Sequence, residues 1–185
     1  GYADFELKTP IPEKAVYRIY SMTKPIISVL AIMLVERGRL HLYDPLLAFD
    51  PRFRFLKVLH TNGELEPAKS AITVEHLLTH RAGFSYEFLL GCQIAAYYRE
   101  ANLVDDGTRT LDEMMGALSK LPLAFHPGED WRYSVATDVL AHVIERATGE
   151  RINVLLKKHI LNYLKVYLSQ YLMKYLKIKK LKKLS

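Results

Sequence analysis

Residues 17–45 read YRIYSMTKPIISVLAIMLVERGRLHLYDP, and this stretch decides the fold. Residues 25–37 form a run that is apolar nearly all round, which predicts a helix buried on every side. Gly38 follows at a position typical of a helix C-cap. A membrane-spanning helix needs about 18 or more apolar residues, so this shorter run is expected to lie in a protein core instead.

A serine and a lysine stand at the entrance of this predicted helix. Ser21-Met22-Thr23-Lys24 is an S-x-x-K sequence, and residues three apart share one face of a helix. Pro25 is tolerated only in the first helical turn, which puts the helix start beside Ser21. There, unpaired backbone N–H groups and the helix dipole favour developing negative charge, as a nucleophile requires.

The lysine must be uncharged to accept a proton from the serine. Desolvation or a neighbouring cation can remove its charge, so a catalytic Ser21–Lys24 pair is chemically feasible. An S-x-x-K is also short enough to occur by chance in a chain of 185 residues. Taken alone, the pattern leaves both interpretations open.

Tyr133 is the second candidate for proton transfer, in the sequence Tyr133-Ser134-Val135. A phenol near a lysine ammonium loses its proton more easily, and could then pass a proton to a leaving group. The alternative is a tyrosine packed at a helix entrance with its hydroxyl hydrogen-bonded.

Three other patterns are weaker. His76 and His80 have the spacing of metal ligands on a helix, but no third ligand is evident, so no metal site is predicted. Residues 83–87 begin like G-x-S-x-G but lack the second glycine. His126-Pro127-Gly128 predicts a turn. No glycine-rich phosphate-binding motif is present, so neither a nucleotide nor any other cofactor is expected.

Periodicity predicts three more helices, at residues 74–80, 111–120 and 137–148. Thr73 and Thr110 are suitable N-caps for the first two, and Gly149 is a suitable cap for the third. The third helix is expected to place Val139, Leu140, Val143, Ile144 and Ala147 on one apolar face. Residues 15–20 alternate enough to predict a short strand.

The C-terminal part of the chain differs in composition from the rest. Residues 1–150 hold 16 Lys+Arg and 20 Asp+Glu, whereas residues 151–185 hold 10 Lys+Arg and no acid. Leucines at 164, 168, 172 and 176 recur every four residues, as do tyrosines at 163, 167, 171 and 175, which predicts an apolar helical stripe. The basic charge could attract membranes or acidic partners only through this tail, and no nucleic-acid partner is expected.

Three segments together resemble the serine β-lactamase-related family, which includes class C β-lactamases, penicillin-binding proteins and similar esterases. They are residues 17–45, residues 72–84 (ITVEHLLTHRAGF) and residues 121–149 (LPLAFHPGEDWRYSVATDVLAHVIERATG), in the family's order. The resemblance implies that Ser21 is the acylated nucleophile, that Lys24 assists its deprotonation and that Tyr133 is the second acid/base. It also implies an acyl-enzyme intermediate, with the Ser21 N–H as an oxyanion donor.

Two departures from the family pattern qualify this inference. Val135 stands where the family's Y-x-N element has Asn, which favours carboxylic esters over β-lactam-like amides as small-molecule substrates. The family's Lys/His-x-Gly strand has no counterpart downstream. We therefore expect an α+β fold fragment of the β-lactamase/transpeptidase type, mostly helical because its C-terminal strands are missing.

The domain expectation is a partial β-lactamase-related domain over residues 1–166 and a basic tail over residues 167–185. Without the missing strands, several apolar side chains of the helix at 25–37 should face water. The expected function is a serine hydrolase using Ser21, Lys24 and Tyr133. The alternatives are an inactive remnant of such an enzyme, or a binding module whose tail lies on a membrane surface.

Overall fold

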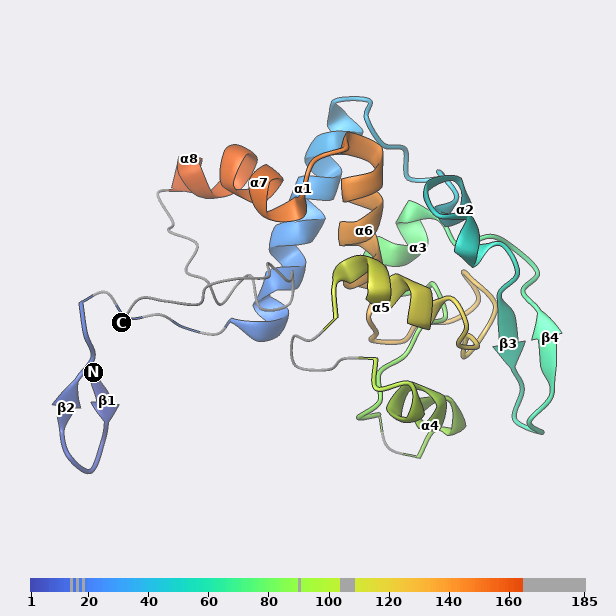
Figure 1. Ribbon diagram of the computed structural model, residues 1–185, viewed down its shortest axis with the longest axis horizontal. Coiled ribbons are helices and arrows are strands. Elements are labelled where there is room, and N and C mark those ends of the chain that lie inside the picture. Colours follow the sequence, from blue (N-terminus) through green and yellow to red (C-terminus); the bar gives the residue numbers. More distant parts are fainter. Residues whose placement is uncertain (14, 16, 18, 90, 104–108, 165–185) are drawn as a thin grey trace.

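Two helices packed side by side form the centre of the molecule. The computed structural model describes residues 1–164 except 14, 16, 18, 90 and 104–108. Helix α1 (Thr23–Glu36) lies against α6 (Ala136–Thr148), as Figure 1 shows. Helices α2, α3, α5 and α7 also contact α6, so α6 is the element around which the core is built.

Shorter elements surround this pair. The further helices are α2 (Leu46–Phe49), α3 (Val74–Leu78), α4 (Gln93–Glu100), α5 (Leu111–Leu118), α7 (Ile152–Leu156) and α8 (Asn162–Leu164). Single turns of other helix types are η1 (Tyr20–Met22), η2 (Pro51–Phe53) and η3 (Lys157–Leu161). The strands are β1 (Tyr2–Asp4), β2 (Thr9–Pro10), β3 (Lys57–Leu59) and β4 (Leu65–Pro67).

The predicted helix starts are confirmed by their capping contacts. The Thr73 hydroxyl accepts a hydrogen bond from the His76 N–H, and the Thr110 hydroxyl accepts one from the Glu113 N–H. In both cases the side chain at the third helical position returns a contact to the cap residue's N–H, which makes a capping box. Gly149 ends α6 with φ +73°, a left-handed conformation that glycine adopts without strain.

Only one face of α1 is buried. Its core face consists of Ile27, Leu30, Ala31 and Leu34. On the opposite face Val29 is 52% exposed and Ile32 is 42% exposed. The prediction that this helix is buried all round is therefore wrong, whereas the expectation that some of its apolar side chains face water is confirmed.

Helix α6 is buried more completely than its single predicted apolar face suggested. Ala141 and His142 are buried as well, and the His142 Nε2 lies 3.0 Å from a carboxylate oxygen of Asp50. Burial alone would raise the pKa of Asp50, but hydrogen bonds from Arg52 outweigh it and lower the pKa. This buried hydrogen bond joins α6 to Asp50, the residue directly before the η2 turn.

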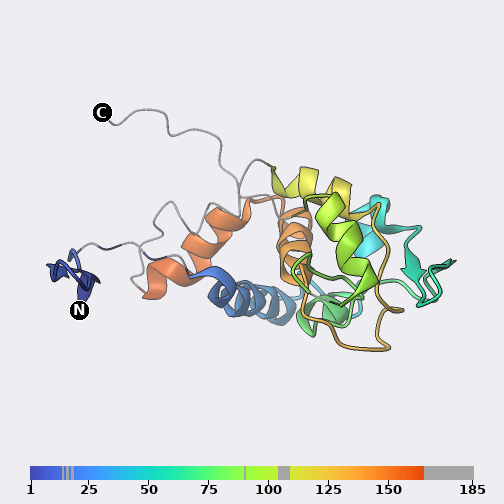
Figure 2. The ribbon, with the colours of Figure 1, turned by 90° about the horizontal axis from the view of Figure 1, so that it is seen from below.

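The strands form two small antiparallel pairs, β1 with β2 and β3 with β4. Figures 1 and 2 both place the first pair apart from the helical body, and its residues are exposed. The predicted strand at residues 15–20 is wrong, because the described residues 15, 17 and 19 belong to no strand and Tyr20 begins the η1 turn. The described part of the chain is thus α+β and mostly helical, as expected.

Two expectations about the C-terminal part fall outside the described residues. Apart from its first members, Tyr163 and Leu164, which are exposed in α8, the predicted leucine and tyrosine stripe lies beyond residue 164, as does the domain boundary between residues 166 and 167. Within the described ranges, no helix combines the length and the apolar character that crossing a membrane requires.

The packing of α1 on α6 yields a stability prediction. Leu30 is fully buried, so Leu30→Ala should lower the free energy of unfolding by about 2–5 kcal/mol through lost burial and the cavity left behind. The matched control is the neighbouring Val29→Ala on the exposed face, which should change it by less than about 0.5 kcal/mol. Urea denaturation followed by circular dichroism measures both, and equal effects would contradict the burial of Leu30.

Candidate active site

The candidate nucleophile lies at the point where the chain enters α1. Ser21 is exposed in the η1 turn, two residues before the first residue of α1. Tyr20, directly before it, has φ +43°, a left-handed conformation that is strained for a tyrosine. The backbone therefore turns sharply at the serine and presents its hydroxyl at the N-terminal end of the helix, where the dipole favours negative charge.

The structure brings Ser21, Lys24 and Tyr133 together. The Tyr133 hydroxyl donates a hydrogen bond to the Ser21 Oγ at 2.7 Å, across 112 positions of sequence. The Lys24 Nζ lies 3.5 Å from the same Oγ and 4.8 Å from the centre of the Tyr133 ring. All three side chains predicted from the sequence thus meet at one hydroxyl oxygen.

Backbone hydrogen bonds hold the Tyr133 loop in this position. The Arg132 N–H donates to the His80 carbonyl at 2.9 Å, and the Val135 N–H donates to the Ser85 carbonyl at 3.4 Å. These bonds flank Tyr133 on both sides. The segment that follows α3, from His80 to Ser85, therefore holds the Tyr133 loop in position.

The position of this segment depends on Gly83. The Gly83 carbonyl accepts a hydrogen bond from the Ala124 N–H at 2.7 Å, and Gly83 has φ +86°. A Cβ at this position would lie 2.5 Å from the Phe125 carbonyl oxygen, which is closer than any real side chain approaches. Only glycine allows the two segments to run so close together.

Tyr86 belongs to the site although the sequence analysis did not select it. The Lys24 Nζ donates a hydrogen bond to the Tyr86 hydroxyl at 3.0 Å, shorter than its contact with Ser21. The Tyr86 ring is buried, and its centre lies 5.5 Å from that of Tyr133. Tyr86 is two residues beyond the segment 72–84 on which the resemblance rested, and nothing in a single sequence distinguishes it from a core tyrosine.

His80 packs against the same tyrosine rather than forming a metal pair with His76. Its ring centre lies 5.1 Å from that of Tyr133, and its Nδ1 is 3.4 Å from the Ser134 Oγ. The Nδ1 of His76 instead accepts the Thr73 N–H in the α3 capping box. Burial, followed by the charge of Lys24, lowers the pKa of His80 and so favours a neutral ring beside Tyr133.

The electrostatics of the site favour ionisation of Tyr133. Burial would raise the pKa of its phenol, but hydrogen bonds with Ser21 and Lys24, together with the positive charge of Lys24, outweigh burial and lower the pKa. A phenol with a lowered pKa, hydrogen-bonded to a serine hydroxyl, can take the proton of that hydroxyl and return it. The arrangement is therefore capable of nucleophilic catalysis at Ser21.

Comparison with known proteins identifies the family of this chain. The family model described as Beta-lactamase matches residues 1–170. The chain belongs to the beta-lactamase family. This finding confirms the family resemblance inferred from residues 17–45, 72–84 and 121–149.

The relatives of this beta-lactamase family member include named esterases. "Esterase EstB" of Burkholderia gladioli is 37% identical over 153 residues, covering 81% of this chain and 37% of the relative. "Lovastatin esterase" of Penicillium rubens is 33% identical over 170 residues, covering 89% of this chain and 41% of the relative. The chain therefore spans about two fifths of the length of these relatives.

Solved structures confirm the β-lactamase/transpeptidase-like fold. "EstCE1, a hydrolase with promiscuous acyltransferase activity" superposes with a TM-score of 0.74 at 30% identity. The match covers 90% of this chain and 42% of that structure. The helix-rich body described here thus corresponds to part of a larger fold.

The contact between Lys24 and Tyr133 predicts a shift in the tyrosine's titration. Lys24→Met removes the positive charge and a hydrogen bond, both of which lower the pKa of Tyr133, so this pKa should rise. NMR titration of ¹³C-labelled tyrosine ring carbons measures this, with the Tyr133 signal assigned from its loss in Tyr133→Phe. Lys69→Met, which removes a surface lysine that contacts Glu129, is the control and should leave Tyr133 unchanged. An unchanged Tyr133 titration in Lys24→Met would contradict the electrostatic role of Lys24.

Proposed function

We propose that this protein is a serine hydrolase that cleaves carboxylic esters through an acyl-enzyme on Ser21. The observation that carries the proposal is the 2.7 Å hydrogen bond between the Tyr133 hydroxyl and the Ser21 Oγ, with Lys24 beside both. The named esterases among the relatives support the same reaction class.

In the proposed acylation step, the Ser21 Oγ attacks the carbonyl carbon of the ester while its proton passes to the Tyr133 phenolate. The positive charge of Lys24 stabilises that phenolate before the transfer. The Ser21 N–H donates to the oxyanion of the tetrahedral intermediate. Tyr133 then gives its proton to the alkoxide as the bond between the acyl carbon and the alkoxide oxygen breaks, so that an alcohol departs and the acyl group remains on the Ser21 Oγ.

Deacylation repeats the sequence with water as the nucleophile. Tyr133 accepts a proton from the attacking water and then returns a proton to the Ser21 Oγ as the acid leaves. An alcohol in place of water would receive the acyl group instead, which is the acyltransferase activity named for EstCE1.

The residue after Ser134 supports esters over β-lactam-like amides. The side chain of Val135 is aliphatic and therefore offers no amide group to a substrate. It is also fully buried in the hydrophobic core. An ester needs only the acyl carbon, its oxygen and the leaving group to be recognised near Ser21.

Active-site labelling tests the nucleophile. A fluorescent fluorophosphonate should label the wild-type chain stoichiometrically and Ser21→Ala not at all, because the Oγ is the atom that reacts. Ser28→Ala, two turns further along α1, is the matched control and should label like the wild type. Intact-protein mass spectrometry measures one adduct per chain.

The pattern of labelling distinguishes an active serine hydrolase from an inactive remnant of one. No adduct on a folded wild-type chain would overturn the proposal and favour the remnant. If Ser21 is labelled and the chain hydrolyses the β-lactam nitrocefin but not the ester p-nitrophenyl acetate, the serine hydrolase proposal would stand. The preference for esters would be overturned.

The pH dependence of labelling tests the role of Tyr133. The phenolate is the reactive base, and its fraction increases as the pH rises through the pKa of the phenol. Because that pKa is lowered, the labelling rate should rise with a midpoint below pH 10, the ordinary tyrosine value. Tyr133→Phe should slow labelling at least about 100-fold and remove this inflection. Retention of the same inflection in the folded variant would assign it to a group other than Tyr133 and would contradict the role of Tyr133 as the base.

A further inference from the structure

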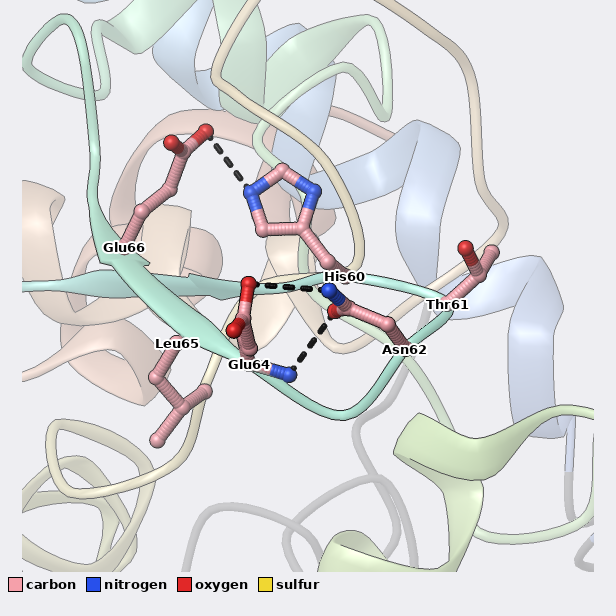
Figure 3. Close-up of a pocket in the computed structure, with 6 residues that line it drawn as sticks. All are labelled: His60, Thr61, Asn62, Glu64, Leu65 and Glu66. Carbon is pink, nitrogen blue, oxygen red and sulfur yellow. Dashed lines mark hydrogen bonds and ion pairs between the residues drawn. The ribbon is translucent and has the colours of Figure 1, made fainter.

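A second cluster of reactive side chains lies where the β3–β4 hairpin meets the loop after α5. His60 follows β3, Glu66 lies in β4, and His126 begins the Pro127-Gly128 turn. Figure 3 shows the His60 ring and the Glu66 carboxylate directed toward each other across the hairpin. None of these residues takes part in the site around Ser21.

Three potential ligand atoms converge in this cluster. One oxygen of Glu66 lies 2.8 Å from the Nε2 of His60 and 2.5 Å from the Nε2 of His126. All three atoms lie within 4.8 Å of one another. Three chain segments therefore present two imidazole nitrogens and one carboxylate oxygen to a common point.

The two imidazole nitrogens share one carboxylate oxygen of Glu66 as their neighbour. Although both are close to the Glu66 oxygen, each Nε2 is buried without a hydrogen-bond partner among the residues that the structure describes. The His126 side chain is only 5% exposed, so water does not reach it freely. Both nitrogens therefore face the same carboxylate oxygen, and a cation held among the three atoms would bind both nitrogens directly.

We propose that His60, Glu66 and His126 bind one divalent transition-metal ion of the zinc type. Two imidazoles and one carboxylate are a common ligand set for such ions, whereas calcium and magnesium prefer oxygen ligands alone. A cation placed among the three atoms would lie about 2.0–2.2 Å from each of them, so the atoms would move slightly apart. Both nitrogens would then be bound to the metal.

The surroundings leave room for a fourth ligand. A pocket of about 600 Å³, open to solvent, lies along the hairpin and is lined by His60, Glu66 and their neighbours. Water can occupy the remaining position of a four-coordinate ion. Metal binding through Nε2 puts the proton of His126 on Nδ1, so the long 3.4 Å contact that Nδ1 accepts from the Lys69 N–H is given up.

The proposed ion has a structural effect at a distance from itself. It connects the β3–β4 hairpin to His126, which lies seven positions before Tyr133 on the same loop. The ion thereby fixes the beginning of the loop whose end is held by His80 and Ser85. This inference stands independently of the proposed hydrolase activity.

Zinc titration of the full chain tests the site. Metal-free protein should bind one Zn²⁺ per chain in isothermal titration calorimetry. Glu66→Gln and His60→Asn should each weaken the affinity at least about tenfold. Glu64→Gln, on the same hairpin and outside the cluster, is the matched control and should bind like the wild type, because its side chain contacts Asn62 instead.

Cobalt substitution provides the second measurement. Wild-type protein with Co²⁺ should show the intense visible absorption of four-coordinate cobalt, and Glu66→Gln should lose it. Equal zinc affinity in the wild type and in folded Glu66→Gln and His60→Asn would overturn the proposal, as would absence of binding by the wild type. If either variant fails to fold, the wild-type cobalt spectrum decides, and absence of the four-coordinate bands overturns the site.

Discussion

The candidate active site depends on the docking of one loop against the segment that follows α3. Ser21 and Lys24 are neighbours on α1 and need no long-range contact to meet. Tyr133 reaches them only because backbone hydrogen bonds to His80 and Ser85 hold both sides of its loop. The packing of α1 on α6 then sets the remaining distance, since α6 begins directly after this loop. A shift of either support by 1 Å would separate the phenol from the serine.

The positive charge of Lys24 is shared between two phenols. Its Nζ donates to Tyr86 at 3.0 Å and faces the ring of Tyr133 at 4.8 Å from the ring centre. Tyr86 is buried and therefore holds the amine in place, whereas Tyr133 is in hydrogen-bonding contact with the reacting oxygen. The two tyrosines thus have different tasks, one positioning the charge and the other using it. His80 adds a neutral ring against Tyr133 that brings no competing charge.

The sequence predicted the features that depend on contacts between residues a few positions apart. It did not predict those that depend on contacts between distant segments of the folded chain. Helix starts at Thr73 and Thr110 were predictable because capping acts over three residues. Ser21, Lys24 and Tyr133, which the structure brings together, could be selected as candidates because each lies in a recognisable segment. Tyr86 was missed because only the folded chain brings it to Lys24. The cluster of His60, Glu66 and His126 was missed for the same reason, since its members are spread over three segments. The burial of α1 was overestimated because an apolar run does not show how many neighbours cover it.

The uncovered face of α1 has a consequence for how the protein behaves in solution. Val29 and Ile32 expose apolar surface beside Met22, which is 63% exposed at the entrance of the helix. Attraction between apolar surfaces weakens on cooling. Any self-association through this stripe should therefore be weakest in the cold and should strengthen as the temperature rises. Concentrated samples are best kept cold, and a detergent or lipid added at room temperature would compete for the same stripe.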